Sequence, residues 1–130
     1  MNSTPSILLV DDQPDFLDNM SLTLESAGYH TIVAANGYEA LKALNSESVD
    51  LILSDIGMPQ MGGYQLFQQV KNNPLWQKIP FVFITGYEFL SENEIKYGKN
   101  LGIRGYLIKP IRATELLLTV EDSLCPAVVV

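Results

Sequence analysis

The sequence has little cysteine, little positive charge and no long apolar stretch, and each shortage argues against a class of protein. Its single cysteine, Cys125, cannot form an internal disulfide, so the chain is compatible with a reducing cytosol. Eight Lys and Arg against fifteen Asp and Glu give a formal net charge of −7. Because non-specific binding to nucleic acid or to anionic membrane requires basic patches, neither is expected.

No apolar run approaches the roughly 20 residues that a membrane-spanning helix needs. Residues 1–6 carry no basic flank and no long apolar core, so we recognise no secretory signal there. Repeats and low-complexity tracts are also lacking. With 130 residues, 47% hydrophobic and 18% charged, the chain has the composition of one soluble globular domain, and we expect a cytoplasmic location.

What the sequence does contain is a series of short apolar runs that alternate with helical patterns. The runs, which we interpret as five strands, cover 7–10, 31–34, 49–55, 80–84 and 106–108. The intervening and final segments predict five helices, over about 14–27, around 40–44, around 66–70, about 91–101 and about 113–124. Strict alternation predicts an α/β fold, a doubly wound five-stranded parallel sheet with helices on both faces.

Four of the predicted strands end on reactive polar residues, namely Asp11 with Asp12, Asp55, Thr85 and Lys109. The carboxyl ends of parallel strands share one edge, where such folds place their chemistry. Neighbouring carboxylates repel one another unless a cation neutralises them, and their hard oxygens suit Mg²⁺. A lysine and a hydroxyl can bind phosphoryl oxygens, and an aspartate can be the nucleophile that forms an acyl phosphate.

Each of these residues also has a purely structural interpretation. An aspartate that closes a strand often only caps the next helix. Thr85 can simply end its strand, Lys109 can be a solvated surface charge, and Tyr106 can be a half-buried aromatic of an edge strand. Their joint occurrence at consecutive strand ends favours a functional site over these separate explanations.

Four motifs lie at the predicted strand ends, namely Val10-Asp11-Asp12, Asp55 with Met58-Pro59 and Gly63, Thr85-Gly86, and Tyr106-Leu107-Ile108-Lys109-Pro110. In these motifs the chain resembles the receiver domain of bacterial two-component response regulators. The resemblance assigns residues 1–124 to a receiver domain and 125–130 to a tail or the start of a linker. It also implies a flavodoxin-like sheet with the strand order 2-1-3-4-5.

By this resemblance Asp55 is the phosphoacceptor, which takes a phosphoryl group from a sensor histidine kinase or a histidine phosphotransfer protein. Asp12 and Asp55 would bind Mg²⁺, or Mn²⁺ in its place, and Asp11 would hold it through water. The backbone carbonyl of Gly57 would be a further metal ligand. Lys109 would pair with the acyl-phosphate oxygens. Such a domain catalyses only its own phosphorylation and dephosphorylation, so we expect no metabolic enzyme.

The resemblance also implies a switch. Thr85 would move toward the phosphoryl group and Tyr106 would swing inward with it. This movement would change the affinity for partners of the face formed by the helix over about 91–101, the strand over 106–108 and the helix over about 113–124. The bond between Lys109 and Pro110 is expected to be cis. The output partner cannot be identified from the sequence, and a phosphorylation-dependent homodimer is one candidate.

Several positions depart from the usual pattern of the family. Gly62 stands where an Asp commonly caps the third helix and Arg112 stands at the cap position of the last one, so both caps should be weaker. The segment that follows Thr85 is longer than usual, which leaves the geometry of the output face open. We expect Tyr87 to shield the acyl phosphate partly from water, whereas Gly57 offers no side chain there.

Three alternatives differ from a receiver in their expected residues. An aspartate-nucleophile phosphohydrolase typically carries D-x-D on its first strand, whereas Asp11 and Asp12 are adjacent here and no second D-x-D occurs. A phosphorylation-independent interaction module would usually lack Asp12, Asp55 or Lys109, all of which are present. A flavodoxin-like cofactor binder would need a first loop rich in Ser, Thr and Gly in place of residues 11–14.

Overall fold

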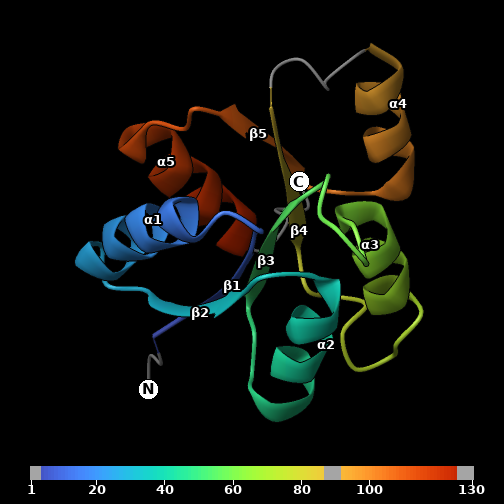
Figure 1. The fold of residues 1–130 in the computed structure, drawn as a ribbon, viewed down its shortest axis with the longest axis horizontal. Helices are drawn as coiled ribbons and strands as arrows, with labels where there is room; N and C mark the ends of the chain where they lie inside the picture. Colours follow the sequence, from blue (N-terminus) through green and yellow to red (C-terminus); the bar gives the residue numbers. More distant parts are fainter. Residues whose placement is uncertain (1–3, 87–91, 126–130) are drawn as a thin grey trace.

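The computed structural model describes residues 4–86 and 92–125, in which strands and helices alternate strictly (Figure 1). The strands are β1 (Ser6–Val10), β2 (His30–Ala34), β3 (Leu51–Asp55), β4 (Phe81–Gly86) and β5 (Gly105–Lys109). The helices are α1 (Pro14–Ser26), α2 (Gly37–Ser46), α3 (Gly63–Lys71), α4 (Glu92–Leu101) and α5 (Ala113–Leu124). Each described helix is too short or too polar to cross a membrane.

All the strand pairs are parallel, and the sheet has the order β2-β1-β3-β4-β5. The predicted fold class and strand order are therefore confirmed. The central strand β3 is buried at every position. In the register of the sheet Val10 lies beside Ser54, and Asp55 lies beside Ile84. The ends of β1, β3 and β4 consequently meet at one edge.

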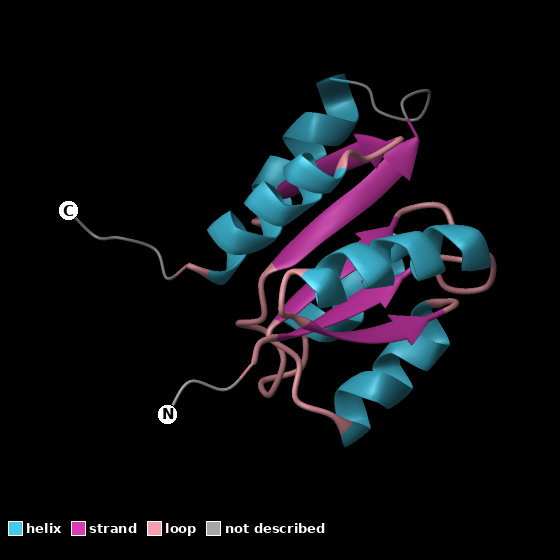
Figure 2. Cartoon of the chain, turned by 90° about the vertical axis from the view of Figure 1, so that its left-hand side faces the viewer, coloured by secondary structure: helices cyan, strands magenta, loops and turns pink. Residues whose placement is uncertain are grey.

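Helices cover both faces of the sheet, as Figure 2 shows. Alternate side chains of each strand point to opposite faces of the sheet. Because helices cover both faces, both sets of side chains are buried, and each strand is therefore a continuous apolar run in the sequence. One set packs against α1 and α5 and includes Ile7, Leu9, Leu51, Leu53, Val82 and Ile84. The other packs against α2 and α3 and includes Leu8, Val10, Ile52, Phe81 and Phe83. This two-sided burial gives the strand ends a rigid support.

The helix starts differ in how well they are capped. Asn36 caps α2 by accepting a hydrogen bond from the backbone N–H of Glu39 at 3.0 Å. Among the described residues, neither Gly62 nor Arg112 makes a side-chain cap bond to its helix, as their residue types predict. At α3 the side chain of Gln65 partly compensates, because its Oε1 accepts the Gly62 N–H at 3.2 Å.

An aromatic cluster fixes α4 against the sheet and α3. The ring of Tyr64 lies 4.9 Å from that of Phe83 and 5.2 Å from that of Tyr97, measured between centroids. Phe83 in turn lies 5.9 Å from Tyr106 on β5. A Cβ atom on Gly98 would collide with the Tyr106 hydroxyl, so α4 approaches β5 closely at this point. The structure thus confirms the helix predicted over about 91–101.

Candidate metal centre and active site

Three carboxylates gather at the carboxyl edge of the sheet. Asp11 and Asp12 directly follow β1, and Asp55 ends the neighbouring strand β3. One oxygen from each of these residues lies within 4.8 Å of the others. Asp11 is fully buried and Asp55 is 8% exposed, whereas Asp12 is exposed. The structure therefore brings together the acidic residues that the sequence singled out.

Burial and the neighbouring carboxylates both disfavour the ionised form of Asp55. Burial, followed by the negative charge of Asp11, raises the pKa of Asp55 from 3.8 to about 6. Lys109 acts in the opposite direction but does not cancel these effects. A divalent cation would relieve the repulsion, and carboxylate oxygens are the ligands that Mg²⁺ prefers. The residues present thus fit a magnesium site.

Lys109 lies across from the carboxylates at the end of β5. Its Nζ forms an ion pair with Oδ2 of Asp11 at 2.7 Å and donates a hydrogen bond to Oε1 of Gln13 at 3.0 Å. The same Nζ lies 4.3 Å from the centroid of the Phe16 ring. Because its side chain is only 21% exposed, Lys109 is not the solvated surface charge of the structural interpretation.

The loop from β1 to α1 is shaped by Asp11. Its backbone N–H donates to the carbonyl of Ala34 at 3.1 Å, which extends the pairing of β1 with β2. Its Oδ1 accepts the backbone N–H of Gln13 at 2.9 Å, and Pro14 then begins the helix. Asp11 therefore has a structural role at the start of α1 and also supplies a carboxylate to the site.

Thr85 and Tyr106 belong to neighbouring strands but face different surroundings. Thr85 is 2% exposed near the end of β4, where its hydroxyl donates to the carbonyl of Gly86 at 3.3 Å. Tyr106 is half-buried at the second position of β5, paired in register with Phe83 and packed beside Gly98. Only Thr85 therefore lies at the edge that carries the carboxylates.

The loop after β3 requires glycine for a steric reason. The N–H of Gly63 donates to the carbonyl of Ile56 at 2.9 Å, and a Cβ on Gly63 would collide with the backbone carbonyl of Asp55. Gly57 is exposed in the same loop, two residues after Asp55. The close approach of Gly63 holds the start of α3 against the end of β3.

Two further predictions concern the peptide bond before Pro110 and the position of Tyr87. The peptide bond between Lys109 and Pro110 is cis. Tyr87 lies outside the described residues. The sequence did not lead us to single out Gln13 and Phe16, although the residue at the start of the first helix pointed to them. Gln13 occupies the N-cap position of α1, where Ser, Thr, Asp and Asn are preferred, and Phe16 follows on the same helix face.

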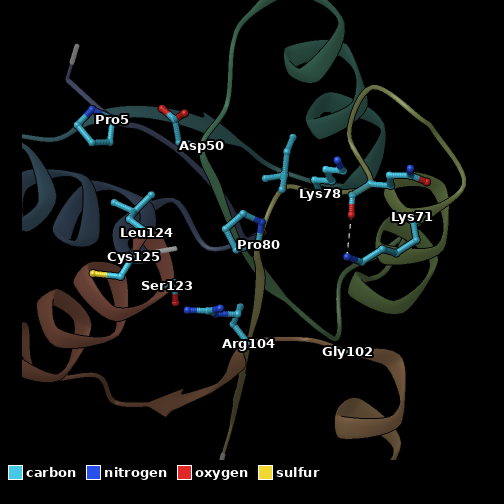
Figure 3. A pocket seen from close by; sticks show the side chains of 12 residues that line it. Pro5, Asp50, Lys71, Lys78, Pro80, Gly102, Arg104, Ser123, Leu124 and Cys125 are labelled. Carbon is cyan, nitrogen blue, oxygen red and sulfur yellow. Dashed lines mark hydrogen bonds between the residues drawn. The ribbon is translucent and has the colours of Figure 1, made fainter. Parts of the chain in front are cut away.

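A hollow of about 570 Å³ lies at the opposite, amino edge of the sheet (Figure 3). It is lined in part by Lys71, Lys78 and Arg104. The Lys71 ammonium donates to the carbonyl of Gln77 at 2.9 Å, and the Arg104 guanidinium donates to the carbonyl of Asp122 at 2.7 Å. Because two of its three cations already bind main-chain carbonyls, this hollow is a weaker candidate than the carboxylate edge.

The sequence of this chain is similar to one protein family and to several known proteins. The family described as response regulator receiver domain matches residues 7–121. The chain is 32% identical to the protein PilH of Pseudomonas aeruginosa, over 91% of this chain and 96% of PilH. It is 41% identical, over 92% of its length, to a Vibrio cholerae protein named "Probable cyclic di-GMP phosphodiesterase". It spans only 26% of that relative.

Solved structures agree over nearly the whole chain. The chemotaxis protein CheY4 of Vibrio cholerae is similar with a TM-score of 0.87 and 32% identity, over 94% of this chain and 100% of CheY4. The receiver domain of an HD domain-containing protein from Pseudomonas fluorescens Pf-5 has a TM-score of 0.84 at 32% identity, over 94% and 95% of the two chains. Together with the fold, these matches show that the chain belongs to the response regulator receiver domains of two-component signalling.

Proposed function

We propose that residues 1–124 accept a phosphoryl group on Asp55 from a phosphohistidine of a sensor histidine kinase or a phosphotransfer protein. One observation carries this proposal. Asp55 ends the central strand as a largely buried carboxylate, grouped with Asp11 and Asp12 within 4.8 Å, while the cation of Lys109 binds to the same group. This juxtaposition of nucleophile, acidic ligands and cation suits phosphoryl transfer.

In the proposed reaction a carboxylate oxygen of Asp55 attacks phosphorus. The new P–O bond forms as the P–N bond of the phosphohistidine breaks, and the departing imidazole takes up a proton. The attacking group has to be ionised, which a pKa of about 6 allows at neutral pH. Lys109 would then exchange its contact with Asp11 for one with a phosphoryl oxygen. Water attack on phosphorus later restores the carboxylate.

The acidic group would hold Mg²⁺, or Mn²⁺, through Asp11, Asp12 and Asp55 together with the backbone carbonyl of Gly57. When bound, the cation would neutralise negative charge on the phosphoryl oxygens. Thr85 is placed at the same edge with a hydroxyl that now donates to the carbonyl of Gly86. In the phosphorylated protein we expect that hydroxyl to donate to a phosphoryl oxygen instead.

The proposed output is a change in the α4-β5-α5 face. Thr85 lies on β4 and Tyr106 on the adjacent β5, and the Tyr106 ring packs against Phe83 and beside Gly98 of α4. A movement of Thr85 would therefore alter the packing beneath α4, a local charge event with a distant effect. An effector, an output domain and a second copy of the chain are the kinds of partner that this face would bind.

The direct test is the intact mass of the protein after incubation with acetyl phosphate and Mg²⁺. We expect a gain of one phosphoryl group by the wild type and by Asp50→Asn, a control at the amino edge of the sheet. Asp55→Asn should gain none. An unmodified wild type, or an Asp55→Asn variant that is still phosphorylated, would contradict the proposal.

The alternatives predict other outcomes in this assay or in a phosphatase assay. An aspartate-nucleophile phosphohydrolase would turn over a generic phosphate ester such as p-nitrophenyl phosphate, whereas we expect no sustained turnover. A phosphorylation-independent interaction module, like a flavodoxin-like cofactor binder, would gain no mass from acetyl phosphate. The adjacent carboxylates Asp11 and Asp12, close to Asp55 and Lys109, favour the receiver.

A further inference from the structure

Among the residues that the structure describes, the ammonium of Lys109 contacts the β1–α1 loop and the first turn of α1. Its partners are a carboxylate oxygen of Asp11 at 2.7 Å, the amide oxygen of Gln13 at 3.0 Å and the ring of Phe16 at 4.3 Å. An ammonium has three N–H donors, so two oxygens and a ring face largely satisfy it. Of these partners only Asp11 is charged.

Gln13 directs its side chain to this lysine instead of to its own helix. It stands at the N-cap of α1, where a side-chain oxygen usually accepts a backbone N–H of the first turn. Among the described residues, its side chain makes no such cap bond. Its backbone N–H is tied to Asp11 at 2.9 Å, and the next residue, Pro14, has a fixed φ. These two constraints hold Gln13 in place beside Lys109.

Two interactions compete for the carboxylate of Asp11. It pairs with Lys109, and it belongs to the acidic group that would bind a divalent cation. A cation that draws Asp11 toward itself weakens the strongest contact of Lys109. A lysine side chain released in this way regains rotamer freedom and no longer points reliably into the site. The neutral amide of Gln13 is attracted less by the cation and can keep its contact.

We propose that Gln13 is a positioning residue that keeps the Lys109 ammonium at the site when Asp11 turns to the metal. This inference rests on the proposed phosphorylation of Asp55. A neutral amide suits the task because it holds the cation without an ion pair that incoming phosphoryl oxygens would have to displace. Phe16 acts with it by covering the ammonium on another side.

Two substitutions test the acceptor of Gln13 and its neutral charge. Gln13→Met keeps the length of the side chain but removes the acceptor, and should slow phosphorylation of Asp55 by acetyl phosphate about five-fold, the effect of one lost hydrogen bond. Gln13→Glu should also slow it, because its carboxylate competes with the phosphoryl oxygens for Lys109. Gln69→Met, at an exposed position of α3, is the matched control and should leave the rate unchanged.

A first measurement detects the contact without any phosphorylation. Lysines are acetylated with an N-hydroxysuccinimide ester in the absence of metal, and peptide mass spectrometry compares Lys109 with Lys71 in the same molecule. Gln13→Met should raise the relative reactivity of Lys109 about two-fold or more, from loss of one shielding hydrogen bond, and Gln69→Met should not. Unchanged reactivity in Gln13→Met would overturn the proposal.

A second measurement tests the role. In a Lys109→Met background, adding Gln13→Met should lower the residual phosphorylation rate no further, because Gln13 acts only through Lys109. A wild-type rate for Gln13→Met, or a further loss in the double variant, would overturn the inference. If wild-type Asp55 gains no phosphoryl group at all, that result contradicts the proposed function and also the role of Gln13 in phosphorylation. The acetylation result then still reports the contact separately.

Discussion

The two ends of the same parallel sheet carry charged residues in opposite ways. At the carboxyl end the charged groups converge, with Asp11 fully buried, Asp55 8% exposed and Lys109 paired to Asp11. At the amino end the Lys71 ammonium and the Arg104 guanidinium separately bind main-chain carbonyls around an open hollow. Both ends are polar, but among the described residues it is the carboxyl end that buries unlike charges close together.

This difference shows that burial and convergence, more than charge itself, distinguish the candidate site. Burial raises the pKa of Asp55 because the ionised form loses its contact with water, and the nearby charge of Asp11 adds to this effect. A perturbed titratable group among specific charge partners is a recognised mark of functional sites. Paired substitutions at the two ends, and the titration of Asp55, test this difference.

The largest contrast is expected between two lysines. Lys109→Met leaves the buried carboxylate of Asp11 without its partner, which should lower the free energy of unfolding by about 3 kcal/mol. It should also slow phosphorylation of Asp55 by about 100-fold or more, as loss of a charge-stabilising group does. Lys71→Met should change stability by less than about 1 kcal/mol and leave the rate intact. Urea denaturation measures the free energy of unfolding, and intact mass measures the phosphorylation rate. Equal effects of the two lysine substitutions would contradict the comparison of the two ends.

The second prediction concerns pH in the absence of divalent cations. The pKa of Asp55 is about 6 in the folded protein and 3.8 in the reference state, so folding favours its protonated form. This contribution to stability is fully present below pH 3.8 and is lost as the pH rises through 6, at most about 3 kcal/mol. Asp55→Asn should therefore gain stability relative to the wild type between pH 4 and pH 7 in urea denaturation. A difference that stays constant over this range would count against the buried, charge-crowded environment of Asp55.

The third prediction compares two glycines. A Cβ on Gly63, at the carboxyl end, would collide with the backbone of Asp55, so Gly63→Ala should destabilise the fold by about 1–3 kcal/mol. A Cβ on Gly105, at the amino end of β5, would meet open space among the described residues. Gly105→Ala should therefore be neutral or stabilising by less than about 1 kcal/mol. Thermal and urea unfolding distinguish the two, and similar values would mean that the loop after β3 adapts easily.

The smallest effect is expected at a helix start. Arg112 occupies the N-cap of α5 without a side-chain cap bond to any described residue. Arg112→Ser supplies an acceptor for the first turn and should stabilise the protein by about 0.5–1 kcal/mol. The converse change at a used cap, Asn36→Ala, should cost about 1 kcal/mol. Urea denaturation of both variants measures the pair, and a loss of stability in Arg112→Ser would show that the arginine makes a contact of its own.

The fold and the identity of the charged residues could be predicted because both depend on local sequence. Short apolar runs that stop at Asp11, Asp55 and Lys109 fix the strand ends, and strict alternation with helices fixes a parallel sheet. The strand order and the chemical roles came from the family resemblance. Parallel strands then bring the ends together without further information.

The partners of Lys109 could not be predicted in the same way. Gln13 lies 96 residues before Lys109 in the chain, and their contact depends on the conformation of one loop. The depth at which Asp55 is buried, and hence its pKa, depends on how the surrounding segments pack. Which carboxylate binds Lys109 is also decided by geometry, and in this structure it is Asp11.

The central claim is that Asp55 is the residue that carries the phosphoryl group. The most direct measurement treats the protein with acetyl phosphate and Mg²⁺, reduces it with sodium borohydride and maps its peptides by mass spectrometry. Borohydride converts an aspartyl phosphate into homoserine, which marks the modified residue. We predict homoserine at Asp55 alone, and its appearance at Asp11 or Asp12, or at no residue, would contradict the account.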